Sequence, residues 1–174
     1  MDVPMQNDQA ITRDSLYGTA AESTYAGITS FMRRRYSRDL RGADVAVSGV
    51  PFDTATSNRP GARFGPRGIR AASAGIAWER HWPWTFDPFD HLAVVDFGDC
   101  DFDYGSQQST PECIEAHADH ILSAGSAMLT FGGSSVKAVT GDGLIVLHRH
   151  VHLGFLIIGG YGMWSTRGCA GACP

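Results

Sequence analysis

Arginine residues crowd one short stretch of this sequence, and a guanidinium group is well suited to a carboxylate or phosphate partner. Four of them lie between positions 59 and 70: Arg59, Arg63, Arg67 and Arg70. Such a cluster binds a separate anion through forked hydrogen bonds, or it pairs with carboxylates inside the protein or across a subunit interface. We favour the second interpretation, because a basic cluster alone indicates electrostatics and does not identify a ligand.

A run of histidines near the end of the chain has the residue type and the spacing of a metal site. His148, His150 and His152 alternate with other residues inside an apolar run from Leu144 to Ile158. In a β-strand this spacing places all three imidazoles on one face, a geometry that holds zinc or nickel. The alternative, which we favour, is an accidental run in a tail without a selected function. The other histidines have no partner at ligand spacing, and the last two share a helix face that we expect to be exposed: His81, His91, His117 and His120.

A third stretch superficially resembles a calcium-binding loop. Asp99, Asp101 and Asp103 alternate and are followed by Gly105. In an EF-hand loop the glycine stands one place earlier and the twelfth position is glutamate, whereas here that position is Thr110. We therefore do not expect metal binding in this stretch. The cysteines show no paired metal-ligand spacing either: Cys100, Cys113, Cys169 and Cys173.

Strands and helices must position these residues. Apolar runs at residues 45–47, 92–97 and 128–131 predict three strands, and continuous rather than alternating apolarity is typical of strands buried on both faces. Residues 144–147 are a candidate for a fourth. After the first run, a loop rich in Gly, Pro and Asn leads to a helix at Pro66, where a missing N–H is tolerated. Ile69, Ala72 and Ile76 then fall at helical spacing on one face. Loops of this kind, at the carboxyl ends of strands, are where open α/β sheets bind ligands.

A second helix is predicted between the last two runs. Either Ser109 forms a capping box with Glu112, or Thr110 caps the helix with Pro111 in its first turn. Gly125 lies near its end. The predicted buried stripe has helical spacing: Ile114, Ala118, Ile121 and Leu122. A strand–helix–strand unit of these lengths requires a right-handed crossover in a parallel sheet, so the predicted fold is a three-layer α/β/α domain.

Length and composition favour one soluble globular domain. The chain has 174 residues, 43% of them apolar and 18% charged, which is enough to bury a core. A net charge of −4 gives no reason to expect binding to nucleic acid or to an anionic membrane surface. We see neither a secretory signal nor an apolar run of membrane length, so we expect a cytoplasmic protein with reduced thiols.

The stretch between the first strand and the first helix also carries a family resemblance. It reads Gly-Val-Pro-Phe-Asp from Gly49, then Thr-Ser-Asn-Arg-Pro-Gly-Ala-Arg-Phe-Gly-Pro-Arg from Thr56, followed by Ile-Arg from Ile69. This pattern resembles the N-terminal signature of the ureohydrolases, and most closely that of agmatinases and guanidinobutyrases, which are relatives of arginase. The resemblance covers roughly residues 25–133. It implies the family's α/β/α fold with a parallel sheet, here truncated.

The resemblance implies hydrolysis of a guanidinium substrate, agmatine or 4-guanidinobutanoate, to urea and an amine, a reaction of polyamine metabolism. The family uses two manganese ions, about 3.5–4 Å apart as in other two-metal sites, to supply hydroxide at neutral pH. Its metal ligands come from Gly-Gly-Asp-His after one strand, Asp-Ala-His-x-Asp after the next, and a later Asp-x-Asp. Here the first motif reads Gly-Gly-Ser-Ser from Gly132, so Ser134 replaces the aspartate and Ser135 the histidine, and the other two motifs are absent. Neutral hydroxyls are not usual manganese ligands.

The sequence therefore assigns no catalytic or metal-ligating residue, leaves the substrate-binding residues unknown, and predicts no stoichiometric manganese. The composition changes at the same point, since Asp142 is the only acidic residue after Gly133 although the chain has 18 in all. A tail read in a shifted frame has this character, as does a divergent natural end, and we favour the first. We divide the chain into a mobile N-terminal arm (residues 1–24), the N-terminal half of an agmatinase-like domain (25–133) and a divergent or frame-shifted tail (134–174).

Two functional hypotheses follow. The first is a truncated agmatinase-like ureohydrolase that is inactive alone. The second is a non-catalytic subunit or interaction partner of a full-length ureohydrolase, whose signature loop and arginine-rich segment preserve an oligomer surface. A homo-oligomer is a separate expectation. The arginine-rich segment is expected to form a solvated or interface face: Arg33, Arg34, Arg35 and Arg38. Because the sheet stops early and residues 153–158 are strongly apolar, we also predict a marginal, aggregation-prone product in which the residues after Gly133 are the least ordered.

Overall fold

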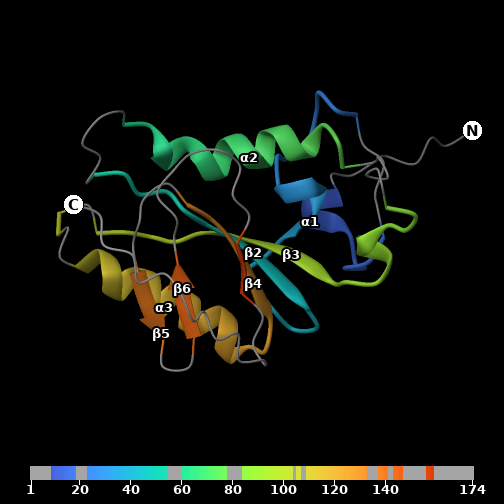
Figure 1. Cartoon of the computed structure of the whole chain (residues 1–174). Coiled ribbons are helices and arrows are strands. Elements are labelled where there is room, and N and C mark those ends of the chain that lie inside the picture. The colour runs from blue at the N-terminus through green and yellow to red at the C-terminus, as the bar shows by residue number, and fades with distance from the viewer. Residues whose placement is uncertain are drawn as a thin grey trace, which may run out of the picture.

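A mainly parallel sheet lies between two helices in a three-layer α/β/α arrangement (Figure 1). The structure is a computed structural model of the chain. It describes residues 9–18, 23–54, 60–77, 84–103, 105–106, 109–132, 137–140, 143–146 and 156–158. The arrangement confirms the predicted fold class.

The central sheet has the strand order β1-β3-β2-β4-β7. The bounds are Arg35–Tyr36 for β1, Val45–Val50 for β2, Val94–Asp99 for β3, Ala127–Gly132 for β4 and Leu156–Ile158 for β7. Strands β1 to β4 are parallel, and β7 runs antiparallel to β4. The three predicted strands are thus confirmed as β2, β3 and β4. Strand β1 was not predicted, because its two residues carry no apolar pattern.

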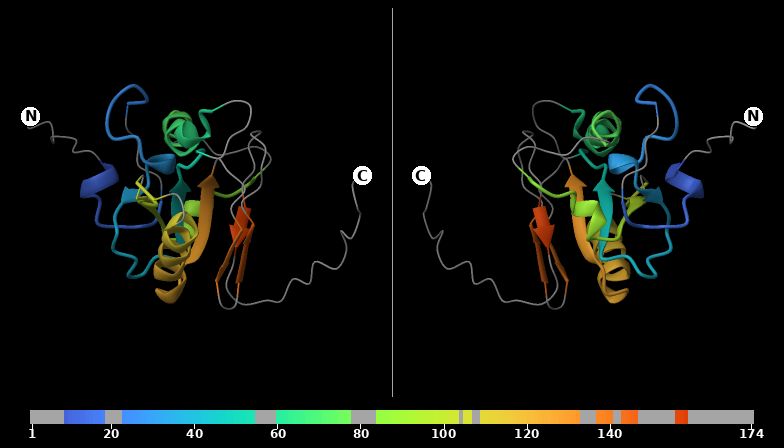
Figure 2. Two further views of the ribbon diagram at one scale, coloured as in Figure 1. Left: turned by 90° about the vertical axis from the view of Figure 1, so that its left-hand side faces the viewer. Right: turned by 90° about the vertical axis from the view of Figure 1, so that its right-hand side faces the viewer.

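Helices α2 (Gly65–Ala74) and α3 (Thr110–Ser123) cover opposite faces of this sheet (Figures 1 and 2). A cluster of buried side chains fills the α3 side, and its strand and helix members include Val50, Val95, Met128, Ile114, Ala118 and Ile121. A smaller cluster fills the α2 side: Met32, Val47, Ala77, Phe89, Val94 and Phe131. The described part of the chain also contains three short 3₁₀ helices: η1 (Phe31–Arg33), η2 (Ala62–Phe64) and η3 (Pro88–Asp90).

Helix α3 largely follows its prediction. Ile114, Ala118 and Ile121 are buried as expected, and Leu122 packs beside them half-buried. The helix has a proline in its first turn, but Ser109 makes no side-chain cap. The Ser109 hydroxyl donates instead to the carbonyl of Ser106 at 2.8 Å. The capping box is therefore wrong, because this hydroxyl is turned toward the preceding loop.

Of the three apolar residues at helical spacing, Ile69 packs, partly buried, against the cluster on the α2 side of the sheet, and the other two do not. Ala72 is exposed and Ile76, just beyond the helix, is 46% exposed. The buried helix residues are Pro66, Arg70, Ser73 and Ala74. Two of these are polar and are buried because they have specific partners, which a hydrophobic pattern does not reveal.

Two glycines allow unusually close packing in the sheet. A Cβ atom at Gly49 of β2 would collide with the carboxylate of Asp99 and lie 2.7 Å from the Cβ of Pro66. Gly98 of β3 has a φ of +84°, and a Cβ there would lie 2.6 Å from the hydroxyl of Tyr36. Only glycine meets both requirements. The first of these contacts sets the start of α2 directly against β2.

The arginine-rich segment before β2 is not a solvated face. Arg33 and Arg34 are only 2% and 1% exposed. Arg33 donates from Nε to the carbonyl of Ala74 at 3.1 Å, and the guanidinium of Arg34 lies 4.1 Å from the centroid of the Phe89 ring. Burial lowers the pKa of Arg34 to about 10. The expectation of a solvated or interface face is wrong for these two residues, whereas Arg38 is exposed.

Part of the expected N-terminal arm packs on the domain. Helix α1 (Gln9–Thr12) contains Ala10, which is fully buried. Arg13 follows it and donates from Nη2 to the carbonyls of Tyr17 and Gly18 at 2.5 and 2.8 Å. The mobility of residues 1–24 stays a prediction.

The described residues of the tail form one hairpin and one short strand. Strands β5 (Lys137–Thr140) and β6 (Gly143–Val146) pair antiparallel in a separate two-stranded sheet. The fourth parallel strand expected at residues 144–147 is therefore wrong, since that segment pairs with its own neighbour in the chain. Over the described ranges, no helix has both the length and the apolarity needed to cross a membrane.

Candidate functional site

Strands β2, β3 and β4 end at one side of the sheet, which we call the carboxyl edge. Gly49 lies opposite Asp99, and Val50 lies opposite Gly132. Helix α2 begins close to the same edge, because Pro66 packs against Gly49. In open α/β sheets the carboxyl ends of the strands are the usual ligand-binding side, so this edge is the candidate site.

A buried carboxylate organises the loop that leaves β2. The side chain of Asp53 is fully buried and forms an ion pair with Nε of Arg63. It also accepts hydrogen bonds from the backbone N–H of Gly61 at 2.6 Å and of Arg63 at 3.2 Å. Burial alone would raise the pKa of Asp53, but these N–H groups and the guanidinium outweigh it and lower the pKa. Asp53 is therefore an ionised anchor that closes the signature loop onto itself.

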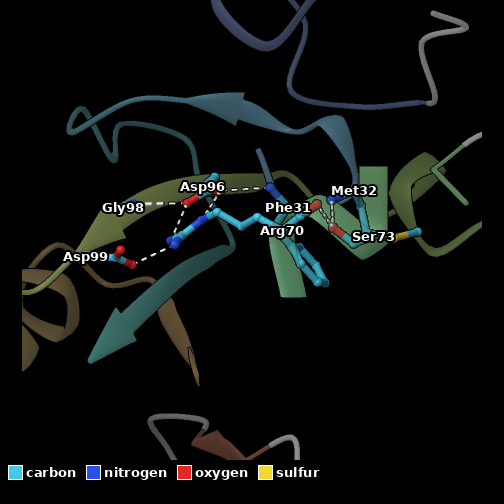
Figure 3. A network of polar contacts seen from close by, with 7 residues as sticks. All are labelled: Phe31, Met32, Arg70, Ser73, Asp96, Gly98 and Asp99. Atoms are coloured by element: carbon cyan, nitrogen blue, oxygen red, sulfur yellow. Dashed lines mark hydrogen bonds and ion pairs between the residues drawn. The ribbon is translucent and has the colours of Figure 1, made fainter. Parts of the chain in front are cut away.

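A second and larger network joins α2 to β3 (Figure 3). Arg70 donates from Nε and Nη2 to the two oxygens of Asp96 at 2.8 and 3.0 Å, and from Nη1 to Asp99 at 2.6 Å. Asp96 is fully buried, and it also accepts the backbone N–H groups of Phe31 at 2.7 Å and Gly98 at 3.0 Å. One carboxylate thus receives four N–H donors from three different segments of the chain.

The network extends from Arg70 to the backbone of η1. Ser73 Oγ donates to the carbonyl of Arg70 and accepts the N–H of Met32, both at 2.9 Å. Burial alone would lower the pKa of Arg70, but the hydrogen bonds and charges of Asp96 and then Asp99 raise it. The guanidinium is therefore permanently charged. Its hydrogen bonds join helix α2 to strand β3, so it is engaged within the chain and not by a separate ligand.

These contacts decide between the two interpretations of the arginine cluster. Arg63 and Arg70 pair with carboxylates inside the chain, as the favoured interpretation predicted. Arg67 is exposed, and Arg59 lies outside the described residues. Of the pairing carboxylates, Asp96 and Asp99 belong to β3 and Asp53 lies in the loop after β2, and sequence spacing did not reveal which arginine each one meets.

Two carboxylates at the carboxyl edge, Asp53 and Asp99, are engaged in ion pairs with arginines. Manganese needs carboxylates and imidazoles that are free to coordinate, whereas Asp53 and Asp99 already engage guanidinium groups. The described part of the chain contains no group of three or more His, Cys, Asp or Glu residues able to hold a metal ion. Ser134 and Ser135 lie outside the described residues, as does the histidine run, His148, His150 and His152.

His117 is placed differently from its prediction. Its Nε2 lies 2.5 Å from the hydroxyl of Ser48, which is fully buried in β2. The imidazole also meets the Phe97 ring edge-on, with ring centroids 5.3 Å apart. Burial, and after it the positive charge of Arg38, lowers the pKa of His117 to about 4. The expected exposed face is wrong for this residue, which is a neutral histidine bonded to the sheet, while His120 is exposed.

The fold and the carboxyl edge define the class of protein. It is an α/β protein with a parallel sheet, and the loop after β2 lies at the side of the sheet where such proteins bind ligands. Comparison with known proteins narrows the class. Residues 43–141 match the model of the arginase family. The chain belongs to the arginase family.

The most similar relatives that we compared are agmatinases. The agmatinase of Chromobacterium violaceum is 54% identical over 132 residues, which are 76% of this chain and 41% of the relative. The agmatinase of Edwardsiella ictaluri is 50% identical over 92 residues, 52% of this chain and 30% of the relative. The first alignment is longer than the segment 25–133, and the family match ends at residue 141, beyond Gly133. The resemblance is therefore somewhat wider than the sequence motifs indicated.

Solved structures agree with this assignment. A hypothetical agmatinase from Burkholderia thailandensis superposes with a TM-score of 0.71 at 55% identity, over 74% of this chain and 40% of that one. The proclavaminate amidino hydrolase of Streptomyces clavuligerus superposes with a TM-score of 0.59 at 36% identity, over 66% of this chain and 38% of that one. The chain thus spans about two fifths of the length of these relatives.

Proposed function

We propose that this chain is a truncated agmatinase-type ureohydrolase that retains the scaffold of the carboxyl edge but, alone, does not hydrolyse a guanidinium substrate. The observation that carries this proposal is the first metal motif, in which Ser134 and Ser135 replace aspartate and histidine; the carboxylates of the carboxyl edge are consistent with it. Asp53 is occupied by Arg63 and two backbone N–H groups, and Asp99 by Arg70. The side chain of Asp53 is fully buried, whereas that of Asp99 is 36% exposed and meets Arg70 through Oδ1.

What these residues do instead is hold the architecture. Asp53 closes the loop after β2, and the Arg70 network joins α2, β3 and η1. In relatives of full length, the family's metal motifs follow the strands beyond this point. Here the first motif has Ser134 and Ser135 in place of aspartate and histidine. Hydroxyls that remain protonated at neutral pH do not replace these ligands.

The test is a urea assay on the purified full chain with agmatine and with 4-guanidinobutanoate, across a titration of Mn²⁺. The Chromobacterium violaceum agmatinase, assayed in parallel, is the positive control. We expect no manganese-dependent urea from this chain, and no manganese retained at stoichiometric level after desalting, measured by elemental analysis. Manganese-dependent turnover by this chain would overturn the proposal.

The coding DNA provides an independent check. Translation of the bases after the Gly133 codon in all three frames should recover Asp-His, followed further on by Asp-Ala-His-x-Asp, if an intact enzyme has been interrupted. Their absence from every frame would favour a divergent natural end. A cytoplasmic location and a role in polyamine metabolism are further parts of this proposal, and both rest on the family assignment.

A further inference from the structure

A groove of about 560 Å³ lies between the loop that precedes β2 and the C-terminal end of helix α3. Residues 38–44 line one side of it, and His120 and Ala124 line the other. These residues belong neither to the loop closed by Asp53 nor to the side-chain network of Arg70. The groove is therefore separate from the candidate site at the carboxyl edge.

Four charged side chains line this groove, and two of them neutralise each other. Arg41 donates from Nε and Nη2 to the carboxylate of Asp39 at 2.9 and 2.6 Å, and its backbone N–H donates to the same carboxylate at 3.1 Å. These hydrogen bonds lower the pKa of Asp39 to about 2. The other two, Arg38 and Asp44, form no ion pair with each other or with any other residue in the described ranges. The groove thus presents one positive and one negative charge without a partner of opposite sign.

Arg38 is held in place although its side chain is exposed. Its Nη2 donates to the backbone carbonyl of Asp99 at 2.8 Å, and its guanidinium lies 4.5 Å from the centroid of the Phe97 ring. Phe97 is 3% exposed, and the ring of His120 packs against it with ring centroids 5.5 Å apart. One buried ring therefore positions a guanidinium and an imidazole, and both carry N–H groups that can donate to a carboxylate.

Asp44 defines the opposite end of the groove. Its Oδ2 accepts the N–H of Ala93 at 2.8 Å, and its carbonyl accepts the N–H of Ala127 at 2.8 Å. The second bond places Asp44 close to the C-terminal end of α3, where Ala124 is the C-cap residue. Carbonyl groups at a helix C-terminus carry partial negative charge. Together with the carboxylate of Asp44, they make this end of the groove suitable for a cation.

The two charges are fixed to different points along the same segment of chain. Arg38 lies over Phe97, whereas Asp44 is bonded to Ala93, four residues earlier. At about 3.3 Å per residue, these points are about 13 Å apart. One hydrogen bond of about 2.9 Å at each end leaves about 7 Å for a ligand. An α-amino acid is too short to reach both charges, but a longer ω-amino acid is not.

We propose that this groove binds a short zwitterion with a carboxylate at one end and an ammonium group at the other, about 7 Å apart. Arg38 and His120 bind the carboxylate, and Asp44 with the C-terminal carbonyls of α3 binds the ammonium group. A dianion is disfavoured by Asp44 and a dication by Arg38, because both side chains line the same groove. The proposal goes beyond the function proposed above, since no residue of the groove belongs to a metal motif.

The test titrates the full chain, labelled with nitrogen-15, with 6-aminohexanoate and follows the backbone N–H resonances of Gly42, Ala43 and Ala124 by NMR. Hexanoate and hexylammonium each carry one of its two charges, and glycine carries both on a shorter chain. We expect 6-aminohexanoate to bind about tenfold more tightly than any of these three probes, because only it makes charge-assisted hydrogen bonds at both ends.

Matched substitutions assign the two ends. Arg38→Gln should weaken binding of 6-aminohexanoate about tenfold and leave binding of hexylammonium within about twofold. Asp44→Asn should show the converse, with binding of hexanoate unchanged. The unchanged probe in each variant shows that the groove is still folded. The control is Arg67→Gln, which removes an exposed arginine from α2 on the other face of the sheet and should change no affinity.

Three results would overturn the proposal. They are the absence of saturable 6-aminohexanoate binding at millimolar concentration, equal affinities for 6-aminohexanoate and hexanoate, and equal losses in Arg38→Gln and Arg67→Gln. Urea release by this chain would instead overturn the proposed inactivity and leave the binding measurement valid, so the two failures are distinguishable.

Discussion

The ion-pair network around Arg70 predicts a large loss of stability when one of its members is removed. Arg70→Met keeps the length of the side chain and its helix propensity but removes three hydrogen bonds at 2.6 to 3.0 Å. Asp96 would then remain fully buried, with only the N–H groups of Phe31 and Gly98 as donors. Breaking a buried pair by removing one partner costs about 3–5 kcal/mol, because the other charge is left without compensation.

Urea unfolding followed by far-UV circular dichroism measures this effect. With a slope of about 2 kcal/mol per M, a loss of about 3–5 kcal/mol lowers the midpoint by about 1.5–2.5 M. Arg70→Lys keeps the charge but not the fork that spans both carboxylates, so we expect an intermediate loss. The double variant Arg70→Met/Asp96→Asn should lose less than the sum of the two single variants, because it no longer leaves a lone buried charge.

The matched control is an ion pair of the same chemistry on the surface. Arg41 pairs with Asp39 at 2.6 Å, but the two side chains are 91% and 49% exposed. Exposed pairs contribute little, so Arg41→Met should leave the midpoint unchanged. If Arg70→Met unfolds within about 0.3 M of the unmodified chain, or if both substitutions have the same effect, the network does not stabilise the fold as argued.

Three further predictions concern other sites. Gly49→Ala should lower the free energy of unfolding by about 1–3 kcal/mol through overpacking. Gly68 lies in open space within α2, so Gly68→Ala should instead raise the free energy of unfolding by about 0.5–1 kcal/mol. Thermal unfolding of both variants tests these opposite signs. Because the folded pKa of His117 is lowered to about 4, the unfolded chain takes up this proton first, so the free energy of unfolding should fall as the pH drops from 6.5 to 4. His117→Gln should flatten that slope, and an unchanged slope would exclude the half-buried His117 as its cause. Burial raises the pKa of the Cys100 thiol to about 12. Iodoacetamide at pH 8 should therefore modify the half-buried Cys113 well before Cys100, as measured by peptide mapping. The reverse order of modification would contradict the burial of Cys100.

Much of the architecture was readable from local patterns. The apolar runs predicted β2, β3 and β4, and the spacing of Ile114, Ala118 and Ile121 predicted the buried face of α3. These elements are recognisable because their burial follows hydrophobicity, which sequence displays directly. The signature around Gly49 likewise pointed to the family to which the chain belongs.

The sequence did not predict the partners of the charged residues, because these partners lie on segments that are distant along the chain and meet only in the folded structure. Arg33 and Arg34 have the composition of a surface, yet they are buried because backbone carbonyls of neighbouring segments accept their N–H groups. Arg70 is likewise buried through its carboxylate partners in β3, while Ile76 is left exposed. A buried ion or hydrogen bond depends on the position of its partner in space, and no periodicity along the chain records that position. The hydrophobic pattern thus predicted the layers of strands and helices. Only the tertiary structure showed which charged side chains form the ion pairs between those layers.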